Sequence, residues 1–129
     1  MLFELQTAAK LHKLSMLDPS ILPARQVMSM ATSVNADILG LIRESGSLTK
    51  GLSADLILID PATPNMIPLH DPYAQIVYSM ENCNIESLIV AGRLIMEKRK
   101  ILTMDEELIL KEIKKWMKTS SVYDFIALS

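Results

Sequence analysis

The segment from Gly46 to Asp60 constrains the fold of this chain more than any other stretch. It holds a glycine turn at Lys50-Gly51, then Ala54-Asp55, then the continuously apolar run from Leu56 to Ile59. An apolar run without alternation is typical of a strand covered on both faces, because neither face carries side chains suited to water. We therefore expect a strand over residues 55–59 with packing partners on both sides.

Length and composition indicate a globular chain. With 129 residues, 50% hydrophobic and 22% charged, the sequence predicts a single domain rather than disorder. The net charge of −2 gives no basis for a nucleic acid partner. No apolar run approaches the roughly 20 residues that span a bilayer, and no signal peptide is evident, so we expect no membrane association. The single cysteine, Cys83, cannot form an internal disulfide and favours a reducing cytoplasm.

Two helices are expected in the first part of the chain. Residues 2–15 are apolar around much of a helical surface, which is typical of a helix that lies against a large body. Pro19 ends this helix. The second helix begins near Pro23, kinks near Ser33–Asn35 because these side chains compete for backbone hydrogen bonds, and stops at Gly40.

The middle of the chain predicts a stiff loop and a short helix. Residues 60–72 contain four prolines, which restrict the backbone. Pro72 can open a helix that extends to Met80, with Asp71 as its cap.

A hairpin and a last helix follow. Residues 86–90 and 93–96 predict two strands joined by a tight turn in which Gly92 supplies the positive φ, and a third strand is expected over Lys100–Thr103. Thr103 and Glu106 have capping-box spacing for the last helix. One face of that helix is apolar and the other is rich in lysine (Ile109, Ile113, Trp116 and Met117; Lys111, Lys114, Lys115 and Lys118). The apolar tail from Thr119 to Ser129 is expected to dock on a neighbour.

The residues with reactive side chains form no recognisable catalytic pattern. A hydrolytic zinc site needs three protein ligands, yet His12 and His70 each lack a second ligand at a known spacing. His70-Asp71 could form a local acid–imidazole pair, although a backbone-bonded loop histidine explains it better. Cys83 has no base nearby in sequence, and Asp105-Glu106-Glu107 fits helix capping better than acid–base work. From the residues alone we expect an α+β domain without a visible active site.

Several motifs, in order, resemble one family. The chain is similar to metal-dependent amidohydrolases, in particular the branch with methylthioadenosine/S-adenosylhomocysteine deaminases and triazine-type chlorohydrolases. The similarity extends from about Met1 to Lys118. Its motifs are Leu2–Lys13, Pro23–Thr32, Ile38–Leu41, Gly46-Ser47-Leu48 with Gly51 and Ala54-Asp55-Leu56, Pro68–Pro72 with Val77-Tyr78, and Val90-Ala91-Gly92-Arg93.

The resemblance implies an α+β fold without the catalytic TIM barrel. Residues 1–44 would be helices that pack on that missing barrel, and residues 45–129 would form half of the family's small β-sandwich domain plus a C-terminal amphipathic helix. The β-domain of the family also takes strands from the N-terminal part of the enzyme. Ala91 in place of the usual asparagine, and Glu97-Lys98 in place of an aspartate-glycine turn, imply a looser hairpin.

The same resemblance implies that the chemistry lies outside this chain. The family holds zinc or iron with histidines and an aspartate of the barrel, all of which precede the equivalent of Met1. We therefore assign no catalytic, cofactor-binding or metal-binding residue here. The apolar faces and open strand edges left without the barrel imply self-association or a barrel-bearing partner chain.

Three functional hypotheses remain at this point. The first is a C-terminal portion of a hydrolase that acts on C–N or C–Cl bonds of nucleoside-like or heteroaromatic compounds, inactive without the barrel. The second is a non-enzymatic oligomerising or interaction domain derived from that family. The third, an unrelated α+β domain, predicts no packing of residues 55–59 beside residues 86–103.

Overall fold

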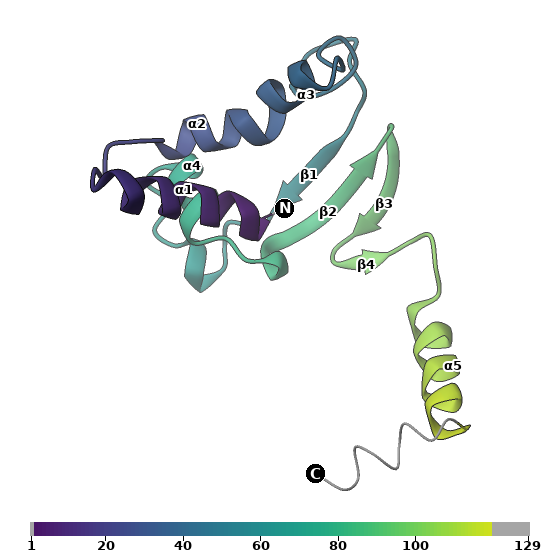
Figure 1. Cartoon of the computed structure of the whole chain (residues 1–129). Coiled ribbons are helices and arrows are strands. Elements are labelled where there is room, and N and C mark those ends of the chain that lie inside the picture. The colour runs from purple at the N-terminus through teal and green to yellow at the C-terminus, as the bar shows by residue number, and fades with distance from the viewer. Residues whose placement is uncertain (1, 120–129) are drawn as a thin grey trace, which may run out of the picture.

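The computed structural model describes residues 2–119 and has an α+β fold (Figure 1). Three helical segments come first, then a strand, a short helix, three further strands and a last helix. The elements are α1 (Leu2–Met16), α2 (Ala24–Ser29), the π-helical turn η1 (Met30–Val34), α3 (Asn35–Ile38), β1 (Leu56–Ile59), the 3₁₀ turn η2 (Pro64–Met66), α4 (Pro72–Tyr78), the 3₁₀ turn η3 (Asn82–Asn84), β2 (Ile85–Val90), β3 (Arg93–Glu97), β4 (Lys100–Ile101) and α5 (Glu106–Thr119).

The helical core forms where α1, α2 and α4 meet (Figure 1). Ala9 of α1, Ala24 and Val27 of α2, and Val77 of α4 are buried there. The two alanines let the helices approach closely because they carry only a methyl group. Since α4 lies after residue 45 and the other two helices before residue 44, this core joins the two parts of the chain. Partly buried residues surround it (Leu5, Leu22, Met28 and Ala74).

The predicted irregularity in the second helix is present. The chain passes from α2 into the π-helical turn η1 and then into α3, so the irregular stretch covers residues 30–34 and overlaps the predicted kink at Ser33–Asn35. Thr32 Oγ1 donates a hydrogen bond to the carbonyl of Met28 at 2.8 Å. Such back-bonding by a threonine competes with regular helical bonding and often bends a helix.

The short helix α4 confirms the sequence prediction. Pro72 occupies its first turn, and the Oδ1 atom of Asp71 accepts the backbone N–H of Tyr73 at 2.9 Å. The helix ends at Tyr78, two residues before the predicted end at Met80.

The four strands form one antiparallel sheet in the order β1-β2-β3-β4. β1 pairs with β2, and Ile57 lies opposite Leu88. The hypothesis of an unrelated α+β domain is therefore wrong, because it required that residues 55–59 not pack beside the hairpin. The third predicted strand is present but ends at Ile101 instead of Thr103, where the chain leaves the sheet toward α5.

Both hairpin turns contain non-glycine residues in the left-handed region. Gly92 has the predicted positive φ of 75°, and Ala91 beside it has a φ of 48°. Lys98 and Arg99 have φ values of 48° and 64°. Two successive residues with positive φ suit the twist of a two-residue hairpin. The first turn is held by Asp55, whose Oδ1 accepts the N–H of Ala91 at 2.7 Å.

The expected cover on both faces of β1 is absent from the described chain. The side chain of Ile57 is 50% exposed and that of Leu58 is 43% exposed. Residues 2–119 contain a single sheet, so no second layer of strands covers these side chains. The prediction from the apolar run is therefore wrong for this chain taken by itself.

The last helix forms, but with a different cap from the one expected. α5 begins at Glu106, and Asp105 Oδ1 accepts the N–H of Leu108 at 2.9 Å. This makes Asp105 the capping residue and leaves Thr103 too far from the helix, so the predicted capping box is wrong. The tail beyond Thr119, which was expected to dock on a neighbour, and the side chains of Lys118 and Thr119 lie outside the described residues.

A buried asparagine connects the proline loop to the sheet. Asn84 is completely buried at the start of β2. Its side-chain amide donates to Asn65 Oδ1 at 3.1 Å and to Thr63 Oγ1, while its Oδ1 accepts from Asn65 Nδ2 at 2.8 Å and from the N–H of Glu81 at 2.7 Å. The backbone carbonyl of Asn84 accepts the N–H of Asp60 at 2.8 Å. One side chain thereby holds the loop in place.

Asn84→Ala should destabilise the chain by about 3 kcal/mol, because it removes the side-chain hydrogen bonds by which a completely buried residue links Thr63, Asn65 and Glu81. Urea unfolding followed by circular dichroism measures this change. Asn82→Ala is the matched control, since Asn82 lies in the same 3₁₀ turn and is exposed. Equal losses for the two variants would contradict the structural role of Asn84.

Stability should also depend on the ionisation of Asp60. The N–H of Ala62, and then Arg99 with its Nη2 at 2.9 Å from Asp60 Oδ2, lower the pKa of this carboxyl. A lowered folded pKa contributes stability above the unfolded value of about 3.9 and loses it as the pH falls through the folded pKa. Asp60→Asn should therefore lower the Tm at pH 7, and this difference should shrink near pH 3. Asp37→Asn is the control, and a gap for Asp60→Asn that persists at pH 3 would refute the electrostatic origin.

Candidate functional site

The structure keeps the predicted candidate residues apart. His12 lies on α1, His70 lies in the loop before α4, and Cys83 lies in η3; all three are exposed. Among residues 2–119, no group of three or more histidine, cysteine, aspartate or glutamate side chains is placed to hold a metal ion. A hydrolytic zinc site needs three protein ligands, so the donors described here do not fit one.

Several aspartates accept hydrogen bonds from backbone N–H groups. Asp71 and Asp105 cap α4 and α5, so the possible His70–Asp71 pair gives way to a helix cap. The N–H of Ala91, and then the hydroxyl of Ser53, lower the pKa of Asp55. A carboxylate that accepts such bonds stays ionised at neutral pH and is a poor proton donor. These carboxylates hold turns and helix ends in place.

Cys83 has no partner suited to nucleophilic catalysis among the described residues. Its Sγ lies 3.8 Å from Glu81 Oε2. A catalytic thiol usually has an imidazole or a cation beside it, which stabilises the thiolate. Arg99 bonds the backbone carbonyl of Cys83 at 2.8 Å and the carboxylate of Asp60, and no bond from its guanidinium to the sulfur is present in the described part of the chain.

The concave region between α3 and the following loop is a packing groove. It has a volume of about 370 Å³ and includes Thr32, Asn35, Ser47 and Asp55. Gly46 lines it with a φ of 95°, and a Cβ at this position would lie 2.5 Å from the Cβ of Ala36. Glycine is required here because the loop passes directly over the helix. The groove has no histidine or cysteine among its lining residues.

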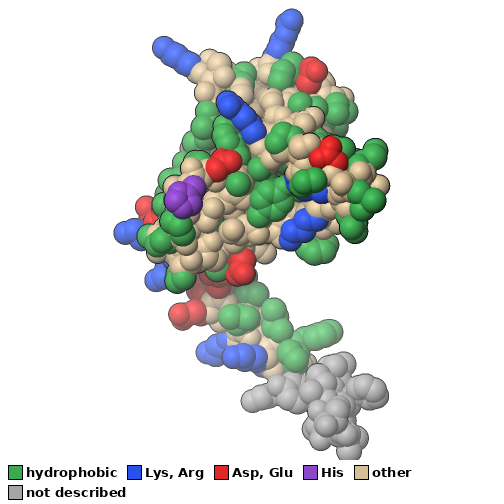
Figure 2. Space-filling view, turned by 90° about the vertical axis from the view of Figure 1, so that its left-hand side faces the viewer, with side chains coloured by type: hydrophobic (Ala, Val, Ile, Leu, Met, Phe, Trp, Pro, Cys, Tyr) green, Lys and Arg blue, Asp and Glu red, His purple; other side chains and the backbone are tan. Residues whose placement is uncertain are grey.

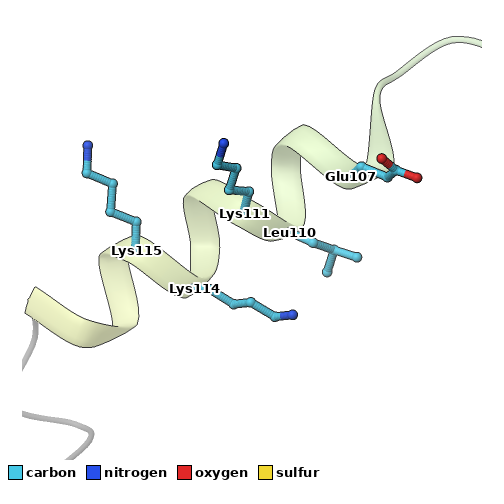
Figure 3. Close-up of a pocket in the computed structure, with 5 residues that line it drawn as sticks. All are labelled: Glu107, Leu110, Lys111, Lys114 and Lys115. Atoms are coloured by element: carbon cyan, nitrogen blue, oxygen red, sulfur yellow. The ribbon is translucent and has the colours of Figure 1, made fainter.

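A second concave surface lies along a single helix, α5 (Figure 3). Its lining residues carry both signs of charge around one leucine (Glu107, Leu110, Lys111, Lys114 and Lys115). A surface formed by one helix cannot enclose a small substrate, so it is better suited to contact with another macromolecule.

Sequence reasoning did not identify the most constrained polar group, the pair Asn65 and Asn84. These residues are 19 positions apart and share no motif, so only the folded arrangement brings their amides together. The proline content of residues 60–72 was the one available signal that this loop is held rigidly. Both side-chain amides are hydrogen-bonded to other groups of the chain, so the network is structural.

The surface of the molecule carries many apolar side chains (Figure 2). Large exposed hydrophobic residues occur on α1, on β1 and on α5, for example Phe3, Ile57 and Trp116. Within residues 2–119, no helix has both the length and the apolar character that a bilayer crossing requires. Contiguous apolar surface on a water-exposed protein is typical of contact with other protein.

Known proteins resemble this chain over almost its whole length. A 5-methylthioadenosine/S-adenosylhomocysteine deaminase of Pelotomaculum thermopropionicum is 42% identical over 115 residues, which is 89% of this chain and 26% of that protein. The crystal structure of a zinc-bound adenosine deaminase from Xanthomonas campestris aligns with a TM-score of 0.82 and 28% identity, over 92% of this chain and 27% of that one. The crystal structure of atrazine chlorohydrolase from Arthrobacter aurescens, complexed with zinc, aligns with a TM-score of 0.75 and 25% identity. This alignment covers 89% of this chain and 26% of that one.

The matched proteins are much longer than this chain. The chain spans about a quarter of the length of the relatives it matches. Residues 1–95 match the amidohydrolase family, in agreement with the motifs found in the sequence. The chain belongs to the amidohydrolase family and corresponds to a fragment of the deaminase branch.

Proposed function

We propose that this chain is the C-terminal portion of a deaminase-type amidohydrolase, and that it acts only together with a metal-binding barrel. The observation that carries the proposal is the extent of the similarity: nearly all of the chain matches a quarter of each relative. The remaining three quarters of such a relative would hold the catalytic groups. The barrel would come from a separate chain or from a longer polypeptide.

The positions of the possible metal-binding side chains support the proposal that the barrel holds the catalytic groups. Hydrolytic amidohydrolases use a metal to supply a nucleophilic water at neutral pH. His12, His70 and Cys83 lie on separate elements, and residues 2–119 contain no cluster fit for an ion. The barrel would therefore bind the zinc or iron, and this chain would shape and stabilise the structure around it.

The substrate class follows from the relatives. They include deaminases of purine nucleosides and a chlorohydrolase of a triazine. The complete enzyme would hydrolyse a C–N or C–Cl bond on a nucleoside-like or heteroaromatic ring. A reducing cytoplasm suits the single exposed cysteine.

Helix α1 offers the best surface for the barrel. Phe3, Leu11 and Leu14 share one side of α1 at helical spacing and are exposed. The opposite side carries Ala9, which is buried against α2 and α4. A helix with apolar residues on two sides is suited to lie between two bodies. In this proposal residues 1–44 face the barrel and residues 45–129 complete the small β-domain.

A second candidate function follows from the same lack of a metal-binding cluster among residues 2–119. A chain without a metal-binding cluster could persist as a non-enzymatic oligomerising or interaction domain. This reading predicts no gain of activity with any barrel and a stable self-assembly instead.

Complementation distinguishes the two. The chain should be produced together with the Pelotomaculum thermopropionicum deaminase from which the matching segment has been removed, and ammonia release from 5-methylthioadenosine measured. We expect turnover only when both chains are present. Turnover by this chain alone, or a pair that associates and stays inactive with metal bound, would contradict the enzymatic proposal.

The surface of α1 can be tested in the same assay. Leu11→Glu and Leu14→Glu each place a charge on the proposed contact and should reduce complementation at least about tenfold, because a buried unpaired carboxylate costs several kcal/mol. Ala62→Glu adds the same charge to an exposed loop outside α1 and serves as control. Equal activity of the three variants would show that α1 does not face the barrel.

A further inference from the structure

We propose that helix α5 is a second contact site for the polypeptide that carries the barrel, called here the barrel chain. The contact would be made by the side of α5 that holds Ile109, Ile113 and Trp116. This inference rests on the proposed function and deepens it, because it names a further surface that the barrel chain would cover. The first such surface is α1, which lies elsewhere in the fold, so the two sites can be tested separately.

Three large apolar side chains lie on one side of α5. Ile109, Ile113 and Trp116 occur at positions i, i+4 and i+7, a spacing that brings them together on a helix. Ile113 is 48% exposed and Trp116 is 76% exposed. With 3.6 residues per turn, Lys111 falls on the opposite side. The helix is therefore amphipathic, and its apolar side is largely uncovered within residues 2–119.

In this arrangement the sheet does not supply the missing cover. Figure 1 shows α5 standing apart from the four strands, and residues 102–105 join it to β4. A helix of 14 residues is marginal in water unless its apolar side packs against another surface. A partner outside residues 2–119 would therefore stabilise α5.

The structural alignment with the adenosine deaminase of Xanthomonas campestris favours the barrel chain as that partner. The alignment covers 92% of the 129 residues of this chain, so at most about ten residues are left out. Because α5 has 14 residues, the alignment extends into α5. The close agreement of the two structures over this extent favours a similar place for α5 in the longer protein. There, the remaining three quarters of the chain would be available to cover its apolar side.

The positions of α1 and α5 favour a large partner. In Figure 1, α1 lies with α2 and α4 at one end of the described chain, and α5 lies at the other end beyond β4. A partner that covers both helices must extend past the sheet between them, and the missing three quarters of a relative has the size to do so. Contact at one helix would also raise the effective concentration of the barrel chain at the other.

Complementation of the Pelotomaculum thermopropionicum deaminase without its matching segment measures the contribution of α5. Ile113→Glu should reduce both ammonia release and the copurified barrel chain at least about tenfold, because a buried carboxylate without a partner is costly. Lys111→Glu places the same side chain on the opposite side of α5 and should stay within about twofold of the unaltered chain. Both positions are exposed, so neither change should alter the circular dichroism of the free chain.

Thiol labelling tests the burial of α5 independently of activity. In a Cys83→Ser background, Ile113→Cys and Lys111→Cys would each be treated with N-ethylmaleimide, and mass spectrometry of this chain gives the labelling rate. Ile113→Cys should react at least about tenfold more slowly in the complex than in the free chain, because access controls the reactivity of a thiol. Lys111→Cys should react at similar rates in both.

Three results would overturn the inference. If Ile113→Glu complements as well as Lys111→Glu, α5 does not contact the barrel chain, and a loss of activity in Leu11→Glu would still support the proposed function. Slow labelling of Ile113→Cys already in the free chain would show that a second copy, or another part of the same chain, covers α5 instead. If the unaltered chain does not associate with the barrel chain at all, the proposed function and this inference fail together.

Discussion

The described chain buries too little of its apolar surface, and most other features of the structure depend on this constraint. Half of the residues are hydrophobic, yet few apolar residues of the described chain are buried (Ala9, Ala24, Val27, Ala36, Met66, Val77 and Met80). Burial of apolar area is the main driving force of folding. Covering the exposed leucine and isoleucine side chains on several elements would therefore add to the free energy of unfolding. The relatives that share these elements are about four times longer than this chain.

Two internal arrangements hold the chain together despite that exposure. The helical core brings α4 against α1 and α2, which links the first helices to the region of the sheet. The amides of Asn84 and Asn65 then tie the proline loop to the start of β2. Both arrangements are local to one side of the molecule. They leave β1 as an open edge and the outer side of α1 uncovered, and α1 is the surface for which contact with a barrel was proposed.

Much of the fold was predictable because its signals are local. The cap at Asp71, the proline that opens α4 and the tight turn at Gly92 each act within a few residues, and the structure confirms them. The position of the irregular turn in the second helix was also close, since it depends on side chains next to the affected backbone.

The remaining features depend on contacts that no short pattern contains. The Asn65–Asn84 pair forms only in the folded chain, and the cap of α5 shifted to Asp105 because the helix starts later than its spacing pattern suggested. The apolar run of β1 predicted cover that the described chain does not supply. The structure places His12, His70 and Cys83 on separate elements, and the expectation that none of them forms a site stays a prediction.

Titration of the isolated chain with zinc by calorimetry tests most directly whether the metal-binding groups lie elsewhere. With its few donors on separate elements, the chain should show no saturable binding of one zinc ion per chain at micromolar concentration. A site with one-to-one stoichiometry that disappears in His12→Ala or His70→Ala would contradict the assignment of the chemistry to a separate barrel.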